Sequence, residues 1–256
     1  MAIQKTEAMI LKTMPFRSTS LIVTFFTRNF GKIRGIIKGV RQEGEMRGGI
    51  FELFSRIEII YYEKTRSDLH LVTESFLLDS YTALHGSLES IAYAGYFSDL
   101  VDQVSEIHDP HEAIFNLLEF AYAYLSCVPG PRMARLFEIK LLHEIGWLPH
   151  LENCLNCGTD VLKEGYFSSR QGSLLCANCA PKFPDAKPLN AEPLSILRHY
   201  VQNEMDACLK LSVSRAAETE LELFMSRFLL ERLNKPLKSQ IFLQKIKSVL
   251  TGTQIP

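Results

Sequence analysis

Four cysteines in two CxxC pairs are the residues of this chain best suited to chemistry. Cys154 and Cys157 form the first pair, and Cys176 and Cys179 form the second after 18 intervening residues. This doubled spacing is typical of a four-thiolate zinc ribbon. Four thiolates complete the tetrahedron around Zn²⁺ and leave no open position for water or substrate. The pattern therefore predicts one structural zinc ion and not a hydrolytic centre.

Two alternatives compete with a zinc site at these cysteines. They could be four reduced thiols packed in a core, or CxxC could be a redox motif. A redox CxxC usually occurs once, beside a βαβ unit, whereas this chain carries the motif twice with ribbon spacing. Between the pairs, Gly165 to Leu175 predicts a β-hairpin that turns at 170–172. Cys127 and Cys208 fall on helical faces and are expected in the core.

Motifs for catalysis are missing from the sequence. It contains no phosphate-binding P-loop, no dinucleotide-binding glycine motif and no HExxH pair. It also lacks the HxE and PCxxC of zinc deaminases and the GxSxG nucleophile elbow. We therefore expect a non-enzymatic protein without a small-molecule substrate.

Charge is unevenly distributed along the chain. The 256 residues include 28 Lys plus Arg and 29 Asp plus Glu, a net charge of −1. Residues 1–47 nevertheless hold nine basic and three acidic groups, 81–160 hold three basic and eleven acidic, and 226–256 hold six basic and one acidic. A basic front, an acidic middle and a basic tail indicate different partners for different segments.

The pattern of apolar residues changes near residue 80. Runs rich in β-branched and aromatic residues predict strands at 3–11, 19–27, 32–38, 50–62 and 69–75. Five short strands suit an OB-fold barrel. Helical periodicity follows over 88–104, 110–125, 133–145, 193–210, 214–233 and 237–250. We predict an α+β multidomain protein, with an OB-fold at 1–80 and an all-helical domain at 81–256 that carries a four-cysteine zinc-ribbon insert at 151–185.

Neither a membrane-spanning run nor a signal peptide is visible in the sequence. The longest apolar runs are far shorter than the roughly 20 residues that cross a bilayer. No basic region followed by an apolar stretch occurs near the N-terminus. We therefore expect a cytoplasmic protein with no membrane partner.

A basic hairpin is the candidate nucleic-acid site. Residues two apart in a strand face the same side, so Lys32, Arg34 and Lys38 share one face. Such a face could track phosphates, and Phe16 could stack on a base. The alternative is a solvated strand face above phenylalanines that fill the barrel core. The full set of candidate DNA contacts is Lys12, Arg17, Arg28, Lys32, Arg34, Lys38, Arg41 and Arg47.

Several segments together resemble the RecO family of bacterial recombination mediators. The most recognisable is Phe30 to Arg41, although Ile37 and Val40 stand where the family usually has Ala. The four-cysteine ribbon resembles the zinc-bearing branch of the family. The other similar segments are 7–12 with 17–21, 47–55, 135–142 ending in Gly146-Trp147, and 235–239.

The resemblance implies an OB-fold, a helical domain and an inserted zinc ribbon. It also implies DNA repair and recombination in the RecFOR pathway of bacteria, in the cytoplasm and at the nucleoid. The implied activities are binding of single- and double-stranded DNA, annealing of complementary strands and loading of RecA on strands coated with single-stranded DNA-binding protein (SSB). The implied partners are RecR, the acidic C-terminal tail of SSB and RecF.

An SSB-tail receptor needs an apolar pocket and a cation for the terminal carboxylate. Arg132 and Arg135 lie in an otherwise acidic region beside Leu136 and Phe137, and they are our candidates. The alternative is a core helix in which Arg135 forms an ion pair. For the whole chain, the competing interpretation is a zinc-ribbon protein–protein adaptor with little DNA binding. The basic segment 28–47 distinguishes the two, since a pure adaptor does not require it.

Overall fold

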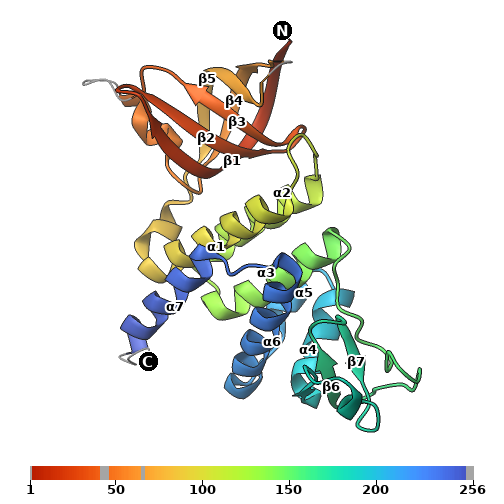
Figure 1. Ribbon diagram of the computed structural model, residues 1–256. Coiled ribbons are helices and arrows are strands. Elements are labelled where there is room, and N and C mark those ends of the chain that lie inside the picture. Colours follow the sequence, from red (N-terminus) through yellow and green to blue (C-terminus); the bar gives the residue numbers. More distant parts are fainter. Residues whose placement is uncertain (1, 41–45, 65–66, 252–256) are drawn as a thin grey trace. The chain divides into compact units, whose positions relative to one another are not determined.

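The computed structural model describes residues 2–40, 46–64 and 67–251 (Figure 1). The chain divides into two compact units, Met1–Cys127 with Leu237–Pro256, and Val128–Pro236. The domain boundary between residues 80 and 81 stays a prediction. Across the described ranges, no helix has both the length and the apolar character that a bilayer crossing requires.

A closed barrel forms the N-terminal part of the first unit. Its strand order is β1-β2-β3-β5-β4, with β4 paired to β1. Neighbours are antiparallel except β3 and β5, which are parallel over 34–36 and 69–71. This order confirms the predicted five-stranded OB-fold barrel. The strands are β1 (Ile3–Phe16), β2 (Ser20–Thr27), β3 (Gly31–Ile37), β4 (Arg56–Tyr62) and β5 (Leu69–Asp79).

Alternating burial explains why β3 forms as a strand. Ile33 and Ile37 are buried in the barrel, whereas Arg34 between them is exposed. The same alternation places Val23 and Phe25 of β2 in the core. One face of each strand therefore builds the interior, and the other is left for helices or solvent.

Strands β1, β4 and β5 differ by several residues from the predicted ranges, and β5 continues to Asp79, past the predicted end at 75. The strand predicted at 50–62 is shorter, because its first two residues belong to a 3₁₀ helix, η1 (Met46–Phe51), and the strand β4 begins only at Arg56. Between them Phe54 has a left-handed backbone with φ 72°, which a continuous strand cannot accommodate. The first strand also continues through Pro15 to Phe16, so Phe16 ends β1 and does not lie outside a strand.

Helices complete the first unit. Phe26 points outward from β2 and stacks on Phe115 of α2, with ring centroids 6.5 Å apart. Ser87 caps α1 by accepting a hydrogen bond from the Ser90 amide. Cys127 was predicted to lie in the core, and this prediction is wrong, because Cys127 is exposed. The helices are η2 (Thr82–Gly86), α1 (Leu88–Val104), α2 (Glu112–Tyr124) and α7 (Lys238–Thr251).

The second unit joins helices to a small three-stranded sheet of order β7-β6-β8. Hairpin β6–β7 confirms the predicted turn at 170–172. The helix predicted at 193–210 is two helices, because Asn203 and Glu204 are extended. Cys208 is buried, as predicted. The elements are α3 (Gly130–Glu144), β6 (Gly165–Ser168), β7 (Ser173–Leu175), η3 (Ala180–Lys182), β8 (Lys187–Leu189), α4 (Ala191–Gln202), α5 (Met205–Lys210) and α6 (Arg215–Leu233).

Candidate metal centre and candidate nucleic-acid interface

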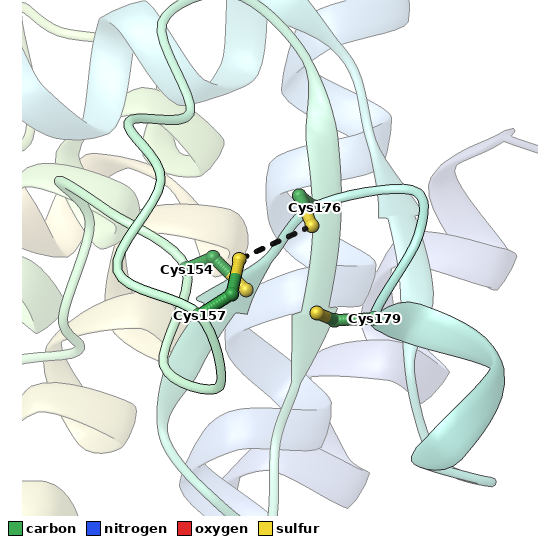
Figure 2. Close-up of side chains that lie close together, drawn as sticks. All are labelled: Cys154, Cys157, Cys176 and Cys179. Carbon is green, nitrogen blue, oxygen red and sulfur yellow. Dashed lines mark hydrogen bonds between the residues drawn. The ribbon is translucent and has the colours of Figure 1, made fainter.

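The first cysteine pair lies on a tight turn. The Cys154 amide donates to Thr159 O at 2.8 Å, and the Gly158 amide donates to Cys154 O at 2.8 Å. Gly158 has φ +72°, a backbone conformation that a residue with a Cβ rarely adopts. The turn brings Cys154 and Cys157 to one side of the loop (Figure 2).

The second pair follows β7 and begins η3. The amides of Cys179 and Ala180 both donate to Cys176 O at 3.0 Å. Figure 2 shows Cys176 and Cys179 facing the first pair from the opposite loop. The four sulfur atoms lie within 4.8 Å of one another, and Cys157 Sγ is 3.7 Å from Cys176 Sγ. The sequence-predicted cysteines therefore form one cluster.

Hydrogen bonds and burial give the thiols of the cluster different pKa values. Burial opposes ionisation of Cys154, but bonds from the backbone of Cys176, Cys157 and Asn156 lower its pKa to about 6. The Asn156 amide, 3.2 Å from Cys179 Sγ, favours the Cys179 thiolate. Burial and the neighbouring sulfurs outweigh that bond and raise the pKa of Cys179 to about 11. A cation is what lets all four thiols ionise together.

The cluster fits a tetrahedral metal ion. Zn–S bonds of about 2.3 Å separate the four sulfurs of a tetrahedron by roughly 3.8 Å, close to the Cys157–Cys176 separation of 3.7 Å. Four sulfur donors suit a thiophilic ion such as Zn²⁺. His150 bonds to Asn153 at 2.7 Å and is not part of the cluster. These four cysteines are therefore a candidate metal site with a closed shell.

Arg198 of α4 fixes the ribbon to the helices of its unit. Its guanidinium donates to the carbonyl oxygens of Leu151 and Val161 at 2.6 Å, and of Leu162 at 2.9 Å. These carbonyls flank the first cysteine pair. No sequence pattern signals this clamp, since its acceptors are backbone atoms 36 to 47 residues away.

Three of the predicted DNA-contact cations are engaged within the first unit, and two of them are lysines. Lys12 Nζ lies 2.6 Å from Asp102 Oδ2 and 3.3 Å from Asp99 Oδ1. Lys32 Nζ donates to the Asp102 carbonyl oxygen at 2.6 Å and lies 3.3 Å from its Oδ1. Both aspartates belong to α1, so these lysines join the barrel to that helix.

Asp102 is the centre of this group. Burial would raise its pKa, but the hydrogen bond from Lys12 and the charge of Lys32 hold the pKa below the ordinary value of 3.8. Asp99 in turn accepts from the Ser239 hydroxyl of α7 at 2.7 Å. Nothing in the sequence indicated the carboxylates that pair with these barrel lysines, because they lie about 70 to 90 residues away along the chain.

Arg28, the third engaged cation, joins the barrel to α2. Its guanidinium is 3.1 Å from Glu112 and 3.2 Å from Glu119, and it also contacts Glu7. The guanidinium carbon lies 4.3 Å from the centroid of the Phe115 ring. Arg28 therefore makes an ion-pair network that a phosphate would have to displace.

The remaining candidate cations are placed differently. Arg34 on β3 and Lys38 just after it are exposed, and neither has a carboxylate within ion-pair distance among the described residues. Arg17, also exposed, lies 5.3 Å from the centroid of the half-buried Phe16 ring. Arg41 lies outside the described residues, as does the side chain of Arg47.

The two arginines proposed for a peptide tail lie on α3. Arg135 is buried and its Nη2 is 2.5 Å from Oε1 of the buried Glu138. Arg132 is half-buried, and its Nε and Nη2 atoms are buried without a hydrogen-bond partner among the described residues. Arg135 therefore has the core ion pair that was the alternative to a tail contact.

The chain is therefore a barrel-and-ribbon protein, which combines a closed five-stranded barrel, a helical region and a four-cysteine ribbon. Residues 1–81 match the family described as "Recombination protein O N terminal", and residues 85–241 match "Recombination protein O C terminal". Together these matches span both the barrel and the cysteine ribbon.

Curated relatives agree over nearly the whole chain. A protein of Anaeromyxobacter dehalogenans (strain 2CP-C) is 30% identical over 254 residues, which are 97% of this chain and 98% of the relative. One of Syntrophus aciditrophicus is 30% identical over 251 residues, 96% and 97% of the two chains. One of Thermoanaerobacter sp. (strain X514) is 25% identical over 255 residues, 97% and 100%. Each is named "DNA repair protein RecO".

The chain belongs to the RecO family of DNA repair and recombination proteins, which are non-enzymatic recombination mediators.

Proposed function

We propose that this protein binds single- and double-stranded DNA through the exposed cations of its barrel and anneals complementary strands. The observation that carries the proposal is the pair Arg34 and Lys38 on β3 and at its end, exposed and without a carboxylate partner among the described residues, in a RecO-family barrel. Arg17 extends the same cationic surface at the β1–β2 turn, where Phe16 offers a ring for stacking.

Annealing requires no covalent chemistry. Two polyanionic strands repel each other, and cations that neutralise phosphates reduce that repulsion. Arg34 and Lys38 make the primary contacts in this proposal. Lys12 and Lys32 also contact phosphates when a phosphate displaces Asp102 from them. Arg28, Arg41 and Arg47 are outer members of the set.

The protein acts in the bacterial cytoplasm, at the nucleoid, and helps to load RecA on SSB-coated single strands. Its partners in this role are RecR, RecF and the acidic tail of SSB. Support comes from the family membership over nearly the whole chain. Among the tail contacts expected from the sequence, Arg132 is the more accessible, and we assign it the main role.

The four cysteines bind one structural Zn²⁺ in this proposal. The donor set and the sulfur spacing support that metal. The ion would supply a crosslink between the two cysteine turns and no catalytic step. The ribbon so fixed would present a surface to RecR.

Equilibrium binding of fluorescent oligonucleotides tests the DNA assignment. Arg34→Glu with Lys38→Glu reverses two exposed charges and leaves the barrel interior unchanged. We expect much weaker binding of single and double strands at low salt, with an unchanged far-UV circular dichroism spectrum. Equal affinity of variant and parent would refute the assignment. Lack of DNA binding by the parent protein would favour the adaptor interpretation.

A synthetic peptide with the SSB-tail chemistry tests the second contact. Arg132→Ala should weaken its binding, whereas Arg215→Ala, which removes an exposed arginine at the start of α6, should not. Equal peptide affinity for Arg132→Ala and the parent would remove Arg132 from the site.

A further inference from the structure

A cavity of about 610 Å³ opens on the outer face of strands β1, β2 and β3. Leu11 and Ile22 are buried at its base. Met14, Leu53 and Ile107 line it with exposed fractions of 51%, 39% and 40%. A cavity of this volume with apolar walls is of the size that holds a small planar group.

Strand register sets cations directly beside this apolar surface. Lys12 pairs with Thr24, and Thr24 pairs with Arg34, so the three form one cross-strand row. The neighbouring row on the same face runs from Met14 to Ile22. Lys12 and Arg34 are two strands apart, roughly 10 Å. The cavity therefore has a charged row along one side and an apolar row along the other.

The two ends of the charged row differ in their partners. Lys12 is paired with Asp99 and Asp102. Arg34 has no carboxylate partner within the described part of the chain, and Lys38 follows four residues later along the same strand direction. A strand whose phosphates follow Arg34 and Lys38 would pass along the open side of the cavity.

We propose that this cavity takes one unpaired nucleobase of a bound single strand, with its flanking phosphate on Arg34. The base would lie against Met14, Ile22 and Leu53. The inference rests on the proposed DNA binding and adds a base-binding subsite to it. Bases of any sequence present an apolar face, so the subsite favours single strands over duplexes, whose bases are stacked and paired.

Asp102 favours a nucleobase over an acidic peptide as the occupant. It lines the cavity, and its ion pairs with Lys12 and Lys32 keep it charged. A carboxylate in direct contact with Asp102 would be repelled by it, although Lys12, Lys32 and Arg34 also line the cavity. The exocyclic amino group of a base could instead donate to Asp102 while the flanking phosphate lies on Arg34. An acidic peptide with an apolar side chain is the competing occupant that the experiment must distinguish.

The test compares two oligonucleotides of equal length and charge, oligo(dC) and an abasic oligomer with the same phosphates. The proposal predicts that the parent protein binds oligo(dC) about tenfold more tightly, the effect of one sequestered base. Met14→Ser with Leu53→Ser changes two exposed side chains of the cavity and should reduce this ratio toward one. Leu78→Ser, an exposed residue of β5 that is 44% accessible and does not line the cavity, should keep the parent ratio.

Each outcome separates the subsite from DNA binding itself. An unchanged ratio in the cavity variant, with both oligomers still bound, overturns the subsite and leaves the proposed function. Failure of the parent to bind either oligomer overturns both. Loss of affinity for an acidic apolar peptide in the cavity variant, at an unchanged oligomer ratio, overturns the nucleobase in favour of a peptide site.

Discussion

Removal of two exposed cations should change the salt dependence of DNA binding by a calculable amount. The structure leaves Arg17, Arg34 and Lys38 without carboxylate partners among the described residues, and Lys12 is half-exposed at 48%. If these cations neutralise about four phosphates of a single strand, log K falls with log salt at a slope near −2.8. Arg34→Ala with Lys38→Ala removes two contacts and should reduce the slope to about −1.4.

The same arithmetic gives the loss of affinity. With an unchanged affinity at 1 M salt, a slope difference of about 1.4 weakens binding about 25-fold at 0.1 M. Fluorescence anisotropy of a labelled oligo(dT), titrated between about 50 and 300 mM salt, measures both values. Lys5→Ala is a matched control, because Lys5 is 61% exposed and its Nζ is 2.9 Å from Glu58 on β4. A double variant whose slope equals that of the parent and the control would show that these two cations do not contact phosphates.

Three further predictions concern the ribbon, the β2–β3 turn and the centre of the lysine pairs. Chelation of the bound metal should expose residues 151–185 to protease before the rest of the chain, because the metal crosslinks their two turns; simultaneous loss of both units would contradict a local role. Gly31→Ala should lower the opening free energy of β3, followed by amide hydrogen exchange, by at least about 2 kcal/mol, since Gly31 has φ +64° and an added Cβ would lie 2.1 Å from Asp109 O. Gly39→Ala is its control, with a similar φ of +75° and nothing within 4 Å of the Cβ, and an equal effect of the two would reject the clash. Asp102→Asn should tighten single-strand binding, because it removes the carboxylate that pairs with both lysines and leaves Lys12 only Asp99 and Lys32 only the backbone oxygen of residue 102. The stability that Asp102 contributes should be complete above about pH 4 and should fall as pH drops through its depressed folded-state pKa, so the thermal midpoints of variant and parent should converge in acid; a constant difference down to about pH 2 would contradict this.

The cysteine cluster and the barrel could be predicted from the sequence because their signals are local. The spacing from Cys154 to Cys179 specifies four sulfurs at one point whatever the rest of the chain does. Alternation in β3, with Ile33 and Ile37 inward and Arg34 outward, identifies a half-buried strand. Both signals lie within a few residues of the atoms that they position.

The sequence could not show in the same way which cations of the basic face form ion pairs and which stay exposed. Lys32 and Arg34 are equivalent in the sequence pattern, but Lys32 is 14% exposed and paired with Asp102, 70 residues away, whereas Arg34 is exposed. Which of these two cations contacts a helix depends on how α1 packs on the barrel, and no local sequence pattern indicates that packing. The environment of Arg135 could not be predicted for the same reason, because helical periodicity does not distinguish a core ion pair with Glu138 from a surface contact.

Annealing of complementary single strands coated with SSB, at low and at moderate salt, is the decisive measurement for the proposed mediator function. We expect the protein to accelerate annealing and salt to reduce the acceleration. Arg34→Glu with Lys38→Glu should abolish the acceleration while the fold is retained. Absence of acceleration by the parent protein on bare and on coated strands at low salt would contradict the proposed function.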